Sequence, residues 1–302
     1  MLAAHIASKH SYYRTFLSLS LLRSEQKIIS KILEVANANN LIRAVLLSGS
    51  RADPKIIKDS FQDFDITYIV TKLEPFVKDK HWIDVFGERL ILQLPDEMTI
   101  GERDEHAFHF LMLFNDGNRI DLTLFPLDKV KGNFKQESLT KVLLDKDQLF
   151  GSLLPPADGD YLIKRPVEKE FLDCCNEFWW VNTYVAKGLC RKEITYAKQM
   201  MDVHVRAMFL KMIEWYVGTL TGFTVCFGIA GRHMKSYISP ELYDRILSTY
   251  PDGRIENIWK ALFAMEVLFD ELAKEVALAV NFPYNQDEAN NIIAYLNQKH
   301  KT

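Results

Sequence analysis

Two aspartates, Asp63 and Asp65, flank a phenylalanine in the stretch FQDFDIT, at the start of an apolar run. In a strand, residues two apart lie on the same face, so the two carboxylates would lie close together. Like charges at that separation repel, and aspartate is disfavoured in strands. An isolated Asp-x-Asp motif of this kind more often lies on the solvent-exposed face of an edge strand. The alternative is that a cation lies between the two carboxylates. Other residues of the chain indicate which interpretation is correct.

A third carboxylate follows in the predicted strand 119–125. Isoleucine and leucine occupy alternate positions there, which places Asp121 on the opposite face, together with Arg119 and Thr123. If this strand neighbours the one that carries Asp65, three carboxylates meet on one face of a sheet. Such a cluster is costly unless divalent cations neutralise it, and hard oxygen ligands favour Mg²⁺.

Gly49 and Ser50 form a predicted turn, and twelve residues separate Ser50 from Asp63. Glycine lets the backbone approach a ligand closely, and successive N–H groups at such a turn can hold phosphate oxygens. A strand, a Gly-Ser turn, an Asp-x-Asp pair and a later strand with one carboxylate together resemble the polymerase-β-like nucleotidyltransferases. Gly-Ser and Asp-x-Asp are each weak signals alone, and their order along the chain makes the pattern specific.

The chemistry that this pattern predicts is nucleotidyl transfer. Asp63, Asp65 and Asp121 form the expected catalytic and metal-binding set, in which Asp63 and Asp65 hold Mg²⁺ on the triphosphate of the nucleotide. Asp121 would lie nearest the attacking hydroxyl, either as a metal ligand or as the base that takes its proton. No motif for a serine hydrolase or a Walker-type phosphate loop is present.

Hydrophobic periodicity predicts the elements that must position these residues. Ser24 suits the N-cap of a helix that runs to about Ala38. The predicted strands are 42–48, 65–70 and 89–94, followed by a hairpin of 109–114 and 119–125, and the predicted helical stretches are 166–220, 239–250, 255–280 and 287–298.

The fold class expected is therefore α+β, with an N-terminal polymerase-β-like nucleotidyltransferase domain built on a mixed sheet and an all-helical C-terminal domain. The predicted boundaries are an N-terminal extension over 1–22, a nucleotidyltransferase domain over 23–155 and a helical substrate-binding domain over 156–302. The Gly- and Pro-rich stretch 151–160 is the predicted linker.

Composition excludes several other classes of protein. The 302 residues are 48% hydrophobic and 25% charged, which is ordinary for a soluble globular protein. A net charge of −3 argues against a nucleic-acid partner. No apolar run reaches the length of a membrane span, and the four cysteines lack metal-ligand spacing, so we expect reduced thiols in a cytoplasmic protein. A monomer is the expected state.

Several longer motifs resemble one family within this superfamily. FQDFDIT at 61–67, CCNEFW at 174–179 and KGLCRKE at 187–193 closely resemble the aminoglycoside 6-adenylyltransferases, which modify streptomycin, and the similarity runs from about Leu22 to the last helix. The resemblance implies a bilobal fold and Mg²⁺-dependent transfer of AMP from ATP to the 6-hydroxyl of the streptidine ring, which inactivates the antibiotic. It also implies that Gly49, Ser50 and Arg51 bind the nucleotide.

The chain departs from that family in two places. Ala52 and Asp53 stand where the family usually has Thr-Asn. In GIAGRHMK at 228–235, only the glycine at 228 and the final Met-Lys match, and Arg232 replaces a lysine. Contacts from this segment, and with them the fine substrate preference, stay open.

One polar stripe on the predicted helix from about Glu168 to Gly188 could read the substrate. Its members are spaced by four, seven, three and four residues, which aligns them on one helix face. The acidic residues would each accept two hydrogen bonds from a guanidinium group of streptidine, and the basic residues would hold triphosphate. The aromatic ring would stack on the guanidinium or the sugar. A solvated face with ordinary ion pairs is the alternative. The stripe comprises Asp173, Glu177 and Tyr184 for the substrate, and Lys187 and Arg191 for the nucleotide.

Two further hypotheses compete with an antibiotic adenylyltransferase. The chain could be a nucleotidyltransferase that acts on another small hydroxylated antibiotic or metabolite, such as a lincosamide-type drug. It could instead be a catalytically silent relative that binds nucleotide or a protein partner. The silent relative is disfavoured because all three carboxylates are present.

Overall fold

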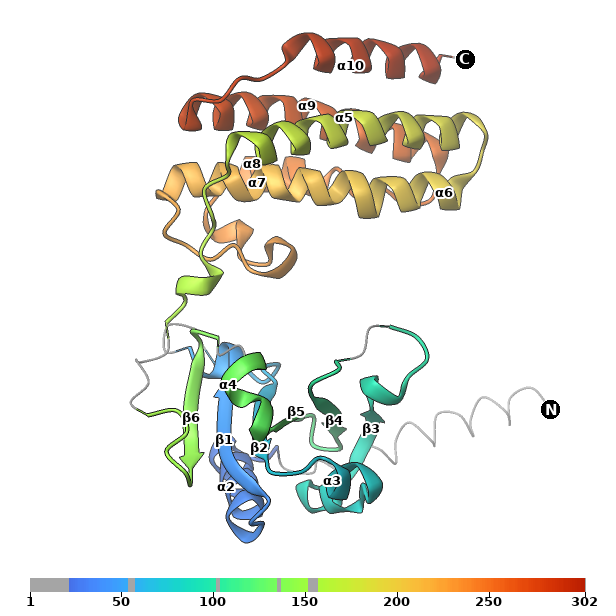
Figure 1. Cartoon of the computed structure of the whole chain (residues 1–302). Helices are drawn as coiled ribbons and strands as arrows, with labels where there is room; N and C mark the ends of the chain where they lie inside the picture. The colour runs from blue at the N-terminus through green and yellow to red at the C-terminus, as the bar shows by residue number, and fades with distance from the viewer. Residues whose placement is uncertain (1–21, 54–57, 102–103, 135–136, 152–156, 302) are drawn as a thin grey trace, which may run out of the picture. The chain divides into compact units, whose positions relative to one another are not determined.

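The computed structural model describes residues 22–53, 58–101, 104–134, 137–151 and 157–301, and the chain divides into two compact units, Met1–Asp160 and Tyr161–Thr302 (Figure 1). The predicted N-terminal extension, except Leu22, and residues 152–156 of the predicted linker lie outside the described residues. The α+β fold class, with a mixed sheet followed by an all-helical region, is confirmed.

The strands described in the first unit form one six-stranded sheet in the order β3-β4-β5-β2-β1-β6. β2 and β5 run parallel to each other, and the other neighbouring pairs run antiparallel. The sheet is therefore mixed, as the sequence predicts. The strand bounds are β1 Ile42–Ser48, β2 Phe64–Val70, β3 Arg89–Gln93, β4 Phe108–Phe114, β5 Arg119–Pro126 and β6 Thr140–Asp145.

One face of this sheet is buried under the helix α2, Glu25–Ala38. The Ser24 hydroxyl accepts the N–H of Lys27 and caps the helix, as predicted. Alternate strand residues point into this core, among them Phe64 and Leu122, which leaves their neighbours Asp65 and Asp121 on the opposite face. Short helices complete the unit: α3 Glu74–Lys78, α4 Val130–Asn133, and 3₁₀ turns at η1 Gly49–Arg51, η2 His81–Phe86, η3 Pro95–Glu97 and η4 Leu127–Lys129. A further 3₁₀ turn, η5 Gly159–Tyr161, includes the last residues of this unit and the first of the next.

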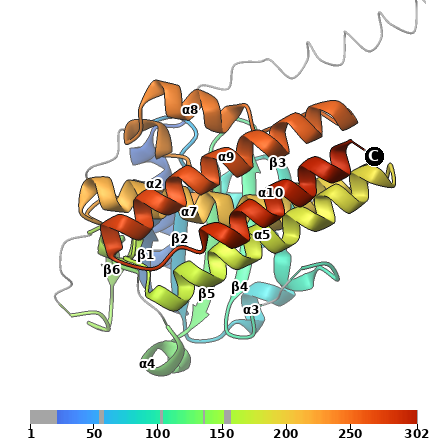
Figure 2. The same ribbon diagram turned by 90° about the horizontal axis from the view of Figure 1, so that it is seen from above.

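The second unit is helical, and its long helices run side by side (Figures 1 and 2). Its core is made of aromatic and aliphatic side chains from α5, α7, α9 and α10, with Phe178 stacked on Phe269 at a centroid distance of 3.6 Å. The bounds are α5 Glu168–Cys190, α6 Ile194–Gln199, the π-helical turn η6 Met200–Val205, α7 Arg206–Thr221, 3₁₀ turns η7 Ile229–Gly231 and η8 Met234–Ser236, α8 Pro240–Leu247, α9 Ile255–Val280 and α10 Gln286–His300.

All four cysteines are free thiols, and Cys174 and Cys175 are buried in the helical core, as predicted. Of the helices in the described ranges, none combines the length and the apolar character that crossing a membrane requires.

Candidate active site

The parallel pairing of β2 and β5 brings two of the predicted carboxylates together. Asp65 is directly opposite Asp121 in the register, and Ser48 at the end of β1 is opposite Asp65 on its other side. Asp63 lies in the loop just before β2. The three carboxylates thus belong to one end of one sheet face, where strands β1, β2 and β5 end or begin.

Gly49 allows this arrangement by having no side chain. Its φ of +71° lies in the left-handed region, and a Cβ built on it would be 2.4 Å from Oδ2 of Asp65. The carboxylate therefore sits directly against the glycine backbone. The Gly49 N–H donates to the carbonyl of Leu139 at 3.1 Å and continues the pairing beyond β1. The Gly49 N–H is thus already paired within the protein, and the predicted nucleotide contacts of Gly49 and Ser50 stay predictions.

The side chain of Arg51 contacts the loop that carries Asp63. Nε donates to the carbonyl of Asp63 at 2.9 Å and Nη2 to that of Gln62 at 2.6 Å. The guanidinium also lies 3.8 Å from the ring centroid of Phe64 and pairs with Glu25 at 3.3 Å. The side chain is only 7% exposed and is held against the backbone of the loop that carries Asp63. Its predicted contact with the nucleotide stays a prediction.

Burial and mutual repulsion disfavour the ionised forms of the carboxylates on this face. Burial raises the pKa of Asp65 to about 6, and the negative charges of Asp121 and Asp63 act in the same direction. Burial also raises the pKa of Asp63, against the opposing charge of Arg119. Both ionised carboxylates would therefore be stabilised by an added cation.

Arg119 is the functional candidate that the sequence argument placed on this face without giving it a role. Its Nε and Nη2 donate to the two oxygens of Asp121 at 2.7 and 2.6 Å, and Nη1 lies 3.7 Å from Oδ2 of Asp63. The sequence signal for Arg119 is its position two residues before Asp121 in the same strand, which places both side chains on the same face of the sheet. Only the pairing of strands shows that it also reaches Asp63.

The donor set suits a hard divalent cation, because it consists of carboxylate oxygens whose charges repel one another. Within the described parts of the chain, no three His, Cys, Asp or Glu side chains are already gathered as a set of metal ligands. Arg119 instead supplies the positive charge between Asp63 and Asp121. A cation at this face would have Asp63 and Asp65 as protein ligands, with Asp121 beside them as a further ligand or as the base.

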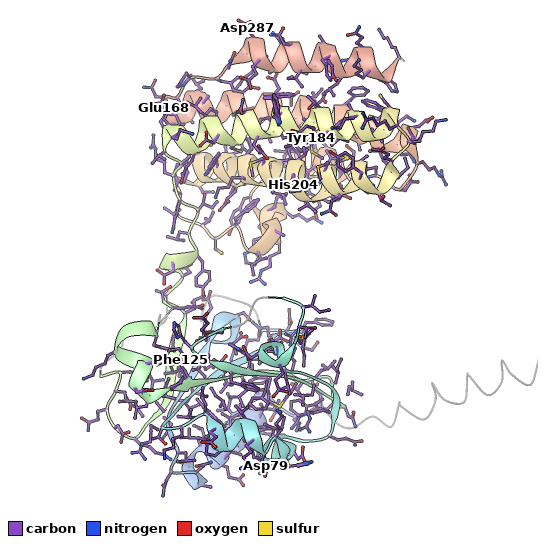
Figure 3. All side chains as sticks on the ribbon, turned by 45° about the vertical axis from the view of Figure 1, so that its right-hand side comes forward. Asp79, Phe125, Glu168, Tyr184, His204 and Asp287 are labelled. Carbon is purple, nitrogen blue, oxygen red and sulfur yellow. The ribbon has the colours of Figure 1, made fainter. Side chains whose placement is uncertain are left out.

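The stripe predicted on the helix is found on α5, in the second unit. Asp173, Glu177 and Lys187 are exposed on that helix, and Tyr184, labelled in Figure 3, is half-buried. Arg191 follows as the exposed C-cap residue. The stripe is therefore accessible, while its predicted contacts with substrate and nucleotide stay predictions.

Contacts along the stripe differ from one end to the other. Asp173 pairs with Lys169 and borders a cavity of about 320 Å³ between α5 and the start of α10. Tyr184 accepts a hydrogen bond from Nε1 of Trp180 at 2.8 Å, and Nζ of Lys187 lies 5.0 Å from the Tyr184 ring centroid. Trp180 is 57% exposed and its neighbour Trp179 is buried. Of these two tryptophans, only Trp180 is thus available for stacking on a ligand.

Comparison with known proteins identifies the family. The family model described as streptomycin adenylyltransferase matches residues 22–299. An aminoglycoside 6-adenylyltransferase of Campylobacter jejuni is 43% identical over 263 residues, which cover 87% of this chain and 91% of that protein. Its counterpart in Bacillus subtilis (strain 168) is 38% identical, with 87% and 93% covered.

A solved structure is also similar in sequence. The crystal structure of an aminoglycoside 6-adenyltransferase from Bacillus subtilis matches with 35% identity and a TM-score of 0.46, over 93% of this chain and 100% of that one. The family model alone spans well over half of the chain, and it starts where the resemblance at about Leu22 was predicted to start. The chain belongs to the streptomycin adenylyltransferase family and is a nucleotidyltransferase.

Proposed function

We propose that this enzyme transfers AMP from ATP to the 6-hydroxyl of the streptidine ring of streptomycin, which inactivates the antibiotic. The observation that carries the proposal is the placement of Asp65 beside Asp121, against the side-chain-free backbone of Gly49. The relatives at 43% and 38% identity are named for 6-adenylylation of aminoglycosides, and the family model is named for streptomycin.

In the proposed reaction, Asp121 takes the proton of the attacking hydroxyl, whose oxygen forms a bond to the α-phosphorus of ATP. The bond from that phosphorus to the bridging oxygen breaks, and pyrophosphate leaves in line. Asp63 and Asp65 would hold a magnesium ion, which would neutralise charge that builds up on the α-phosphate. Ser50 in the turn orients the phosphates through its N–H and hydroxyl groups.

The acceptor side of the proposal rests on α5. A planar guanidinium matches a carboxylate through two parallel hydrogen bonds, and streptidine carries two guanidinium groups. Asp173 and Glu177, one helical turn apart, would accept these forks. Because Asp173 now pairs with Lys169, the guanidinium would replace that lysine. Tyr184 and Trp180 would offer their rings to the ligand.

Acceptor specificity tests this proposal. Incubated with ATP and Mg²⁺, the protein is expected to add one AMP to streptomycin and to leave kanamycin-type drugs, which lack streptidine, essentially unmodified, as measured by mass spectrometry. Lincosamides belong in the same panel. Equal modification of streptomycin and kanamycin would show that guanidinium recognition does not determine acceptor specificity. Modification of a lincosamide alone would show that the acceptor is a lincosamide and not streptomycin.

The role of Asp121 has its own prediction. The variant Asp121→Asn is expected to lose turnover strongly while calorimetry finds its affinity for Mg²⁺·ATP little changed, because Asp63 and Asp65 still bind the metal. Its residual rate is expected to rise with pH as hydroxide replaces the missing base. A large loss of Mg²⁺·ATP affinity with an unchanged pH profile would make Asp121 a metal ligand instead.

A further inference from the structure

Arg119 makes contacts that no role in the proposed reaction explains. Its guanidinium donates hydrogen bonds to both oxygens of Asp121 and lies near Asp63, so one side chain contacts two of the three carboxylates. Two parallel bonds from an arginine to one carboxylate are the strongest geometry for such a pair. The hydrogen bonds to Asp121 raise the pKa of Arg119 further, so it stays charged.

This contact places a positive charge where a metal ion would bind. The guanidinium fork uses one lone pair on each oxygen of Asp121 and leaves the others free, but a cation held by these carboxylates would be repelled by the guanidinium. The repulsion falls when at least one bond from Arg119 to Asp121 is released. The Arg119 side chain is 43% exposed, against 21% for Asp121, and it is long and flexible, so it has room to turn toward solvent.

The same contact serves the protein when no metal is bound. Asp63, Asp65 and Asp121 would otherwise repel one another at a partly desolvated sheet face. Arg119 supplies the opposite charge there, at 2.6 Å from Asp121 and 3.7 Å from Asp63. An added cation between those carboxylates would reduce the same repulsion.

We propose that Arg119 is the internal counter-ion of the metal-free site, and that a divalent cation binds by displacing it from Asp121. The proposal rests on the proposed function, since it assumes that the carboxylates bind the metal. It makes Arg119 a positioning residue: it preserves the face before the nucleotide arrives, and it lowers the affinity of the empty protein for free metal ions.

Metal binding without nucleotide tests the proposal. Mn²⁺, followed by electron paramagnetic resonance, is the probe, and the variants are Arg119→Gln and the control Arg43→Gln. Arg43 also grips an aspartate, Asp147, through Nε and Nη2, but from the exposed far end of β1. We expect Arg119→Gln to bind Mn²⁺ about tenfold more tightly, about 1.4 kcal/mol, and Arg43→Gln to bind it as the wild type does.

Thermal unfolding gives a second readout. In EDTA, the Tm of Arg119→Gln is expected to fall by about 2 to 4 °C because the carboxylates lose their counter-ion. Mg²⁺ is then expected to raise the Tm of this variant by more than it raises that of the wild type, as a ligand that binds the folded state more tightly must do.

Unchanged or weaker Mn²⁺ binding in Arg119→Gln would overturn the proposal, since it would mean that Arg119 does not compete with the metal. If this variant does not fold, Arg119→Lys is measured instead. An ammonium keeps the charge but cannot form two parallel hydrogen bonds to Asp121, so Arg119→Lys is expected to bind Mn²⁺ with an affinity between those of the wild type and Arg119→Gln. If Arg119→Lys binds Mn²⁺ no more tightly than the wild type, the proposal is contradicted. Neither readout needs ATP or an acceptor, so each stands even if streptomycin is not modified.

Discussion

The variant Asp65→Asn is expected to lose at least about a hundredfold in turnover, about 2.7 kcal/mol of transition-state stabilisation, while it keeps its fold. Asp65 is central on the site face, between Ser48 on β1 and Asp121 on β5, and its carboxylate lies against Gly49. An amide of the same shape keeps the packing but removes charge that the metal ion needs. Steady-state kinetics with a saturating acceptor measure the loss.

Asp147→Asn is the control for this variant, because Asp147 is also an aspartate of the first unit but pairs with Arg43 away from the site face. It is expected to keep its turnover. Wild-type turnover in Asp65→Asn would refute the assignment of Asp65 as a metal-binding carboxylate.

The same substitution is expected to stabilise the metal-free protein. The pKa of Asp65 in the folded state is about 6, raised by burial from 3.8, so folding favours the protonated form. The ionised carboxylate therefore lowers the free energy of unfolding above pH 6, and this penalty disappears as the pH falls toward 4. In EDTA, Asp65→Asn should have a higher Tm than the wild type at pH 7 and a similar one near pH 4. A lower Tm at pH 7 would contradict this reading of the site.

The second large effect is expected from Gly49→Ala, with turnover reduced at least about a hundredfold. The added methyl group would meet Oδ2 of Asp65 at 2.4 Å, so the carboxylate or the turn must shift. A displacement of about 1 Å at a reacting centre costs about two orders of magnitude in rate. Kinetics and calorimetric binding of Mg²⁺·ATP measure the damage.

Gly117→Ala controls for backbone strain. Gly117 has a φ of +80°, similar to that of Gly49, but no described atom lies within 4 Å of a Cβ built there. Both variants therefore have the left-handed conformation forced on alanine, and only Gly49→Ala adds the clash. Equal losses of turnover in the two variants would show that strain, and not the approach of Asp65, explains the effect.

The sequence by itself determined the elements and the chemical types of the site. Alternation of apolar residues in 119–125 placed Asp121 on the face away from the core, and helical periodicity located α9 at its observed bounds, Ile255–Val280. Ser24 was recognisable as a cap because its hydroxyl satisfies a helix N–H. These features depend on neighbours within a few positions, so local pattern is sufficient to predict them.

Only the tertiary structure decided which of these residues meet. Periodicity gives the face of a strand but neither its neighbours nor its register, so the sequence leaves the parallel pairing of Asp65 with Asp121 as an assumption. The same holds for Arg51, whose guanidinium turns to the carbonyls of Gln62 and Asp63, and for Arg119, which reaches Asp63 from another strand. Such contacts join positions up to 56 residues apart, and their geometry is set by the sheet that packs them together.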